Sequence, residues 1–407
     1  MSFPSIEGGA TERQEPVAPF NVAALPRIVF GNGTFEQLVP QMLDHGREFL
    51  IVTGGHSFLD SSYWPRLKAE LESAGAGYGV ARISGEPSPG QVDTIVRRYA
   101  REGIDCVVGI GGGSALDAGK AIAGLLPNRR PVRDFLEGVG RPHDYRGPAL
   151  PFLAVPTTAG TGSELTRNAV ITETGPDGFK KSFRNDLLLP KLALVDPDML
   201  VTCPPRVMLG NALDAVTQLL ESLVSTRASV FTDALARDGL RAFAQGFRPN
   251  RDHPVRDHSQ LAYAAMISGL CLTQAGLGSV HGFASPLGAF FGIAHGMACG
   301  TMLAACTETN IRLLQGRGEN HPALAKYAEA YGILTGQDPR AAASDPMALA
   351  GLFQQWTDQC ELPRLSELGV RAGDLTRLVA ASGGNSMKTN PVVLTDRELE
   401  SILRQRL

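Results

Sequence analysis

Four side chains have the chemistry of a divalent metal site: those of two histidines, an aspartate and a glutamine. Asp214 and Gln218 lie four residues apart in a helix-like stretch, so both face one side of that helix. His281 and His295 follow in an apolar, glycine-rich segment. One carboxylate, two neutral imidazoles and one amide oxygen can hold a cation and leave a position open for substrate. The alternative for each histidine is a buried core residue whose hydrogen bonds are satisfied.

A glycine-rich turn points to nucleotide chemistry. The apolar run 106–110 continues into Gly111, Gly112, Gly113 and Ser114, where a helix-like stretch begins. Glycines let backbone N–H groups approach a pyrophosphate, and a helix N-terminus adds free donors and a favourable dipole. The spacing differs from the usual GxGxxG fingerprint, so a tight turn capped by Ser114 remains the alternative.

A threonine-rich loop supports the nucleotide interpretation. Thr157, Thr158 and Thr161 follow the apolar run 152–155, with two glycines among them. Their hydroxyls suit ribose and phosphate oxygens, although such a loop can also satisfy its own backbone. Because both loops follow successive strands, we expect them at the sheet edge where open α/β sheets bind ligands.

The elements that must position these residues fall into two halves. Short apolar runs predict strands at 49–53, 78–83, 106–110, 152–155 and 194–197, with helices at 57–73, 90–102 and 114–126 between them. After Pro204 the strand signals stop, and apolar spacings of three and four predict helices at 205–227, 229–246, 256–275, 295–315, 322–334, 346–359 and 373–381. The sequence therefore predicts an α/β nucleotide-binding domain over residues 1–203 and an all-α domain over 204–407.

Composition excludes several classes of protein. The 407 residues carry a formal net charge of −3, so no basic surplus is available to bind nucleic acid. No apolar run reaches the roughly 18 residues that a membrane span needs, and residues 1–20 lack the apolar core of a secretory signal. The six cysteines form no CxxC pair, which favours reduced thiols and a cytoplasmic protein.

Taken together, these motifs resemble the iron-containing, or group III, alcohol dehydrogenases. The resemblance covers roughly residues 25–400 and rests on GGGSALDAGKAIA at 111–123, PTTAGTGSE at 156–164, ALDA at 212–215, HGFASPLGAFFGIAHG at 281–296, and Asn390-Pro391. It implies the fold shared with glycerol dehydrogenases and dehydroquinate synthases, with the active site in the cleft between the two domains. It also implies that Fe²⁺ or Zn²⁺ polarises the substrate oxygen while hydride passes to or from NAD or NADP.

The resemblance assigns roles to individual residues. The metal ligands would be Asp214, Gln218, His281 and His295, and the catalytic residues His281, His295 and Ser285. The nucleotide would contact Gly54, Ser57, Gly111, Gly112, Gly113, Ser114, Asp117, Thr157, Thr158, Thr161, Thr166, Asn168 and Lys181.

Three positions depart from the family pattern. Metal-dependent members have histidine where this chain has Gln218, and an amide oxygen is a weaker ligand. A weakened or differently selective metal site and a site without metal are both open, the latter as in the maleylacetate reductases. Without metal, His281 or His295 would donate to the substrate oxygen. Many members have a proton-relay histidine at the position of Ser285, which cannot titrate near neutrality.

The third departure concerns the nucleotide. NAD-preferring relatives place an acidic residue after the first strand, whereas this chain has Gly54-Gly55-His56-Ser57. A loop without a carboxylate tolerates the 2′-phosphate, which favours NADP over NAD. The alternative is that Asp60 reaches the ribose.

We therefore expect an NAD(P)-dependent oxidoreductase acting on a small alcohol, aldehyde or keto acid. A metal-independent reductase of the maleylacetate type is the nearest alternative. A dehydroquinate synthase-like lyase and a non-catalytic nucleotide-binding protein are more distant alternatives. The lyase needs basic residues for a phosphorylated substrate, and 264–300 contains no lysine or arginine. We expect a homodimer, with neither nucleic acid nor membrane as a partner.

Overall fold

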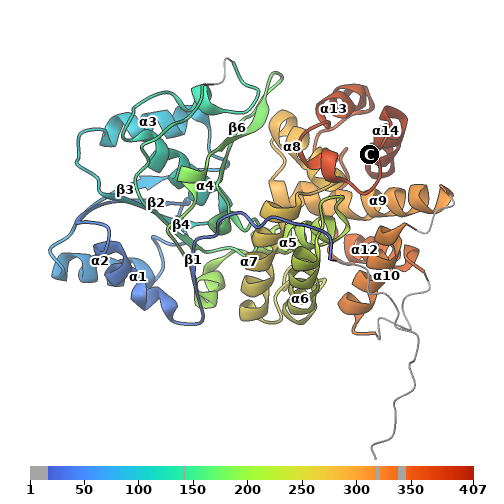
Figure 1. The fold of residues 1–407 in the computed structure, drawn as a ribbon, viewed down its shortest axis with the longest axis horizontal. Coiled ribbons are helices and arrows are strands. Elements are labelled where there is room, and N and C mark those ends of the chain that lie inside the picture. Colours follow the sequence, from blue (N-terminus) through green and yellow to red (C-terminus); the bar gives the residue numbers. More distant parts are fainter. Residues whose placement is uncertain (1–16, 141–142, 318–320, 338–344) are drawn as a thin grey trace, which may run out of the picture.

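A six-stranded parallel sheet forms the centre of the N-terminal half. The computed structural model describes residues 17–140, 143–317, 321–337 and 345–407. The sheet has the order β1-β8-β5-β4-β2-β3 (Figure 1). Its strands are β1 (Arg27–Phe30), β2 (Glu48–Thr53), β3 (Gly77–Arg82), β4 (Cys106–Gly111), β5 (Phe152–Pro156) and β8 (Leu192–Val195).

Helices cover both faces of this sheet because its central strands are apolar on both sides. Leu50 and Val52 of β2 pack with α3 (Pro89–Tyr99) and α4 (Gly113–Leu125). Phe49 and Ile51 pack on the opposite face with α1 (Leu38–Leu43) and α2 (Tyr63–Ser73). Strands buried on both faces carry continuous apolar runs, which is why the sequence predicted them.

The C-terminal half is helical, as predicted. Its helices are α5 (Pro205–Val224), α6 (Val230–Gly246), α7 (His258–Ala275), α8 (Ser279–Phe291), α9 (His295–Gly316), α10 (Pro322–Thr335), α12 (Met347–Gln359), α13 (Leu375–Ala381) and α14 (Asp396–Arg406). The short 3₁₀ helices are η1 (Thr34–Gln37), η2 (Val132–Phe135), η3 (Ser163–Leu165), η4 (Asp186–Leu188), η5 (Pro197–Thr202), η6 (Ala372–Asp374) and η7 (Ser386–Thr389). The predicted class, a parallel α/β half followed by a helical half, is confirmed.

Some elements have no counterpart among the predicted ones. Strand β1 and the antiparallel hairpin of β6 (Asn168–Glu173) and β7 (Phe179–Arg184) were not predicted. Helix α8 contains two glycines and Pro286, which weaken a helical signal, and α14 is mostly charged. The hairpin extends from the α/β half toward α8 (Figure 1).

Two pairs of glycines let segments of the helical half approach other backbone closely. A Cβ added to Gly296 of α9 would overlap the backbone carbonyl of Gly210 in α5. A Cβ added to Gly162, before η3, would overlap the backbone of Gly269 in α7. The first contact sets the distance between α5 and α9, which carry Asp214 and His295.

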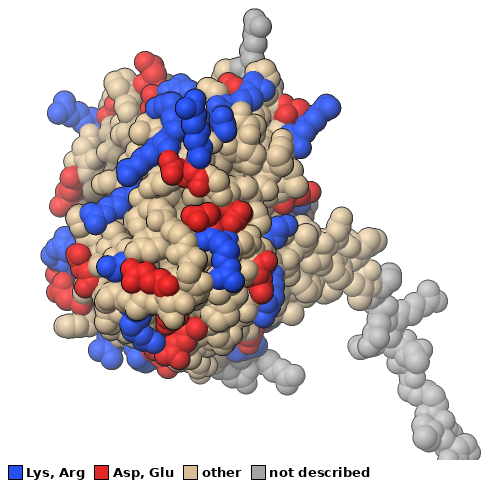
Figure 2. Space-filling view, turned by 90° about the vertical axis from the view of Figure 1, so that its left-hand side faces the viewer, with Lys and Arg blue, Asp and Glu red and all other residues tan. Residues whose placement is uncertain are grey.

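The outer side of the α/β half carries charges of both signs. Figure 2 shows lysine and arginine side chains interspersed with aspartate and glutamate over this face. Arg66 pairs with Glu36, and Arg130 pairs with Asp134, both at 2.8 Å. Such exposed pairs each stabilise a fold by about 1 kcal/mol at most.

Among the described helices, none is by itself long and apolar enough to cross a membrane. The consecutive helices α7 and α8 reach that length and composition only together, and the chain bends by 102° between them.

The contact between α5 and α9 generates a testable prediction. Gly296→Ala should lower the free energy of unfolding by about 1–3 kcal/mol, because the added methyl group pushes two packed backbones apart. Gly316→Ala, near the end of the same helix, meets no atom within 4 Å and should be neutral or stabilising. Urea unfolding of both variants measures the difference, and equal stabilities would contradict this account of the crossing.

Candidate active site

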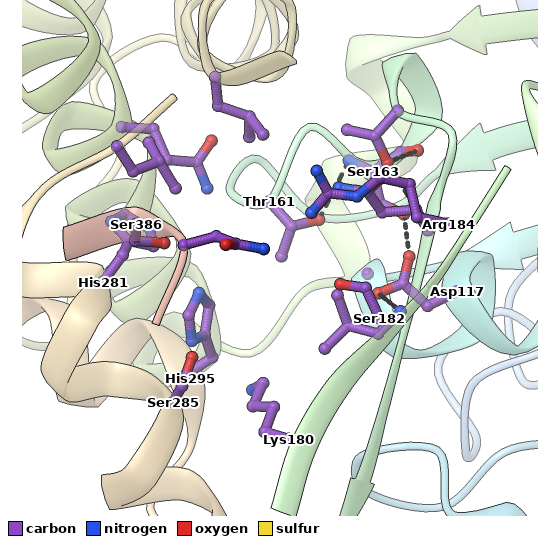
Figure 3. A pocket seen from close by; sticks show the side chains of 18 of the residues that line it. Asp117, Thr161, Ser163, Lys180, Ser182, Arg184, His281, Ser285, His295 and Ser386 are labelled. Carbon is purple, nitrogen blue, oxygen red and sulfur yellow. Dashed lines mark hydrogen bonds between the residues drawn. The ribbon is translucent and has the colours of Figure 1, made fainter. Parts of the chain in front are cut away.

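A cavity of about 310 Å³ lies between the α/β half and the helical half. Figure 3 shows His281, Ser285 and His295 on one side of it, facing Ser163, Ser182 and Arg184 on the other, with Lys180 between the two sides. Of the residues predicted to serve the site, ten line the cavity: Gly113, Ser114, Asp117, Thr161, Thr166, Asn168, Gln218, His281, Ser285 and His295. The structure therefore brings the nucleotide motifs and the metal motif to one space.

The predicted nucleotide loops meet at the carboxyl edge of the sheet. The Thr157 N–H donates to the Gly111 carbonyl at 3.0 Å, and Gly111 lies beside Gly54 at the end of β2. The chain winds in opposite directions on the two sides of the β2–β4 boundary, so this edge is a switch point where open α/β sheets bind ligands.

The start of α4 presents free N–H groups to this edge. Gly112 occupies the N-cap position, and no side chain caps the helix. The alternative of a tight turn capped by Ser114 is therefore wrong. An uncapped helix start with glycines at its tip offers donors and a positive dipole to an anion.

Several predicted nucleotide residues do not line this cavity: Gly54, Ser57, Gly111, Gly112, Thr157, Thr158 and Lys181. Gly54 opens onto free space, because a Cβ placed there would meet no atom within 4 Å. Thr158 lies against Gly112 and braces the glycine turn. The glycines and threonines thus shape the edge beside the cavity.

Strand β7 presents alternate residues to the cavity. Lys180, Ser182 and Arg184 line it, whereas Lys181 is exposed outside the lining. The Lys180 ammonium pairs with Glu86 at 2.5 Å. Since side chains alternate across a strand, the prediction at Lys181 missed the inward-facing lysine by one position.

Asp117 fixes the threonine-rich loop to α4. Its carboxylate accepts from the Ser163 hydroxyl at 2.5 Å and from the Val170 N–H at 3.1 Å. The fully buried Lys120 donates to the same carboxylate at 2.9 Å and to the Thr166 hydroxyl at 2.9 Å. Asp117 lines the cavity but has these internal partners, and Lys120 was not singled out from the sequence.

Asp214, His281 and His295 converge on one point. The Asp214 Oδ1 atom lies 3.2 Å from His281 Nε2 and 3.7 Å from His295 Nε2. The second oxygen, Oδ2, is buried and has no hydrogen-bond partner. A buried carboxylate with an unpartnered oxygen between two imidazoles fits a divalent cation.

The charges in this cluster favour the ligand forms of Asp214 and His295. Burial alone would raise the pKa of Asp214, but His295 and His281 outweigh it and bring that pKa to about 2. Burial and the nearby Lys180 ammonium lower the pKa of His295 to about 4, so its imidazole is neutral at neutral pH. Burial alone would lower the pKa of His281, but Cys299 and the carboxylates Asp214 and Glu221 raise it.

Cys299 joins the same cluster. Its sulfur lies 3.8 Å from His281 Nε2 and 3.9 Å from His295 Nε2. One ligand atom from each of Asp214, His281, His295 and Cys299 lies within 4.8 Å of the others. Sequence reasoning missed this cysteine, although its position four residues after His295 on α9 places both on one helix face.

Gln218 has a partner elsewhere. Its Oε1 accepts from the Ser268 hydroxyl at 2.8 Å. The side chain lines the cavity from the expected face of α5, so the predicted helix face is correct. Its amide oxygen, however, points to α7.

Ser285 lines the cavity one helical turn after His281 on α8.

Glu221 orients His281 from behind. Its Oε2 lies 2.7 Å from His281 Nδ1 and accepts from the Gly278 N–H at 2.8 Å, while Oε1 accepts from the Val280 N–H at 2.7 Å. The carboxylate therefore caps the start of α8 and fixes the ring of a candidate ligand. A carboxylate on the far nitrogen of a metal-binding histidine also raises its basicity.

We expect Glu221→Gln to weaken divalent metal binding about 10- to 100-fold, because the amide cannot accept all these bonds at once. Metal titration of the chelator-treated protein measures this loss. Glu329→Gln, which removes a partly exposed carboxylate paired with Arg237, should leave the affinity unchanged. Equal affinities in the two variants would contradict the orienting role of Glu221.

Family models match nearly the whole chain. The iron-containing alcohol dehydrogenase model matches residues 26–197, and the model of the C-terminal part of the same family matches residues 209–407.

Curated relatives and solved structures agree with this match. Long-chain-alcohol dehydrogenase 1 of Geobacillus thermodenitrificans is 31% identical over 76% of this chain and 81% of its own length. 1-Propanol dehydrogenase PduQ of Salmonella typhimurium is 32% identical over 74% of this chain and 77% of its own. The structure of ADH/D1, an archaeal alcohol dehydrogenase from a Red Sea brine pool, covers 97% of this chain and 100% of its own at 26% identity, with a TM-score of 0.85. This chain belongs to the iron-containing alcohol dehydrogenase family.

Proposed function

We propose that this protein is an NAD(P)-dependent oxidoreductase that moves a hydride between nicotinamide and a small alcohol or aldehyde. One observation carries the proposal: an uncapped helix start beside two glycine- and threonine-rich loops opens onto the cavity that His281 and His295 line, with Asp214 buried next to both imidazoles. The relatives named for long-chain alcohols and for 1-propanol support an alcohol or aldehyde as substrate.

The residues divide the work as follows. The first turn of α4 binds the pyrophosphate of the cofactor, and β7 faces the cofactor with Lys180, Ser182 and Arg184. A divalent cation such as Fe²⁺ or Zn²⁺, held by the Asp214–histidine cluster, would supply Lewis-acid polarisation of the substrate oxygen.

A residue of the cavity wall transfers the proton that the reaction needs. Aldehyde reduction takes a hydride from the dihydronicotinamide and one proton from the protein. The Ser285 hydroxyl lies in the lining one turn after His281 and can pass that proton inward from solvent. Unlike a histidine, a serine passes the proton without changing its own charge near neutral pH.

We also propose the remaining organisation of the protein. Residues 1–203 act as the nucleotide domain and 204–407 as the metal and substrate domain, since β8 ends at Val195 and α5 begins at Pro205. The exposed edge strand β1, with Phe30 at its end, suits pairing in a homodimer. All six cysteines lie in the described part and none is in a disulfide, which supports a cytoplasmic location.

The test is oxidation of NADPH and NADH with a panel of straight-chain aldehydes and keto acids. We expect activity with aldehydes, and we expect it to fall at least a hundredfold in Asp214→Asn, a loss of about 2.7 kcal/mol in transition-state stabilisation. Asp358→Asn, which alters an exposed carboxylate on α12 that accepts from Gln354, is the matched control. If every substrate fails with both cofactors, the proposed activity is wrong. If Asp214→Asn is as active as the control, the role of the cluster is wrong.

Cofactor choice is tested at Gly54. We propose that NADP is favoured over NAD because the open space at this residue holds no carboxylate. Gly54→Asp should shift the ratio of NADPH to NADH affinity at least tenfold toward NADH, about 1.4 kcal/mol, by repelling the 2′-phosphate. Fluorescence titration with both cofactors measures the ratio. Gly55→Asp, also in open space, tests whether the position of the charge matters. A wild-type protein that already prefers NADH would contradict the proposal.

A further inference from the structure

We infer that Cys299 is a metal ligand of this protein, and that the primary ligands are Asp214, His281, His295 and Cys299, with Gln218 outside the set. The inference rests on the proposed function and specifies the metal site within it. It departs from the expectation based on resemblance, which placed the fourth ligand on Gln218.

The separations of the candidate ligand atoms match a tetrahedral zinc site. With ordinary bond lengths to zinc, a nitrogen and an oxygen lie about 3.3 Å apart, and a nitrogen and a sulfur about 3.6 Å apart. The two nitrogen–oxygen distances are 3.2 and 3.7 Å, from His281 and His295 to Asp214. The two nitrogen–sulfur distances are 3.8 and 3.9 Å, from the same imidazoles to Cys299. Small side-chain adjustments close the difference.

Gln218 is turned away from this point. An amide binds a metal through its oxygen, and the Gln218 oxygen accepts from Ser268 on α7 at 2.8 Å. The Gln218 side chain also helps to lower the pKa of the Asp214 carboxyl. Gln218 therefore supports the carboxylate, which is the role of a neighbour and not of a ligand.

The Cys299 thiol has no competing backbone acceptor among the described residues. The buried thiols of Cys106 and Cys271 lie 3.6 and 3.8 Å from backbone carbonyls. The Cys299 sulfur, in contrast, approaches the two imidazole nitrogens. It is fully buried, so any polar partner of the sulfur must belong to this cluster.

A thiolate in the set changes which ion is favoured. Thiolate ligands favour zinc, whereas sets of oxygen and nitrogen alone are less selective. On binding, the Cys299 S–H bond breaks, a sulfur–metal bond forms and the proton leaves to solvent, with no change of oxidation state. We therefore expect Zn²⁺ in preference to Fe²⁺ when both are supplied.

Cobalt substitution tests the ligand directly. The protein is stripped by chelator dialysis and reloaded with Co²⁺, and its near-ultraviolet absorption is recorded. A thiolate ligand gives a sulfur-to-cobalt charge-transfer band, which we expect in the wild type and in Gln218→Ala. It should be absent in Cys299→Ala and Cys299→Ser, and zinc affinity should fall at least tenfold in both. The serine variant retains the shape of the side chain if the alanine variant is unstable.

Cys306→Ala is the matched control, because this thiol is also buried and lies seven residues further along α9. It should retain the band and the zinc affinity. The inference is overturned if the wild type shows no band or binds no metal, if Cys299→Ser retains the band, or if Gln218→Ala alone strips the metal. None of these measurements needs substrate, so an inactive protein with the band would refute the proposed activity and leave the ligand assignment intact.

Discussion

The carboxylate of Glu221 is the contact on which the geometry of the site depends. It extends from the last turn of helix α5, accepts two N–H groups from the start of α8, and faces the imidazole of His281. A buried carboxylate is stable only with such partners, and a helix start that is buried away from water needs such acceptors. The two N–H groups therefore stabilise the carboxylate, and the carboxylate caps the helix. Together these contacts fix the orientation of the His281 ring.

The cavity exists because two independent pieces of backbone meet at glycines. Gly162 lets the threonine-rich loop rest on α7, and Gly210 lets α5 rest on α9. The first contact brings the carboxyl edge of the sheet toward the helices, and the second brings Asp214 toward His295. These close backbone contacts hold the segments around the cavity together. A substitution in the cavity wall cannot take their place.

Sequence patterns predicted the structure correctly where a single local pattern determines the secondary structure or the helix face. Buried parallel strands gave apolar runs, and the spacing of Asp214 and Gln218 gave the correct helix face. Patterns failed where the outcome depends on partners distant in sequence. Nothing local to Gln218 shows that Ser268 takes its amide oxygen, and nothing local to Cys299 shows that Asp214 and His281 lie opposite it. The hairpin was missed because β7 carries lysine and arginine on its cavity face, and the lysine was misplaced by one residue for the same reason.

The hydrogen bonds of Asn390 have a consequence for the order in which the protein is made. Asn390 accepts from the Ser279 N–H, 111 positions earlier, and exchanges hydrogen bonds with Asn310. During synthesis on the ribosome, the parallel sheet emerges complete long before Asn390 does. The carboxyl edge of the sheet can therefore form on the nascent chain, whereas the Ser279 N–H at the start of α8 gains its acceptor only when Asn390 has been made. The first turn of α8, which carries His281, therefore gains its full set of hydrogen bonds only after Asn390 has been made.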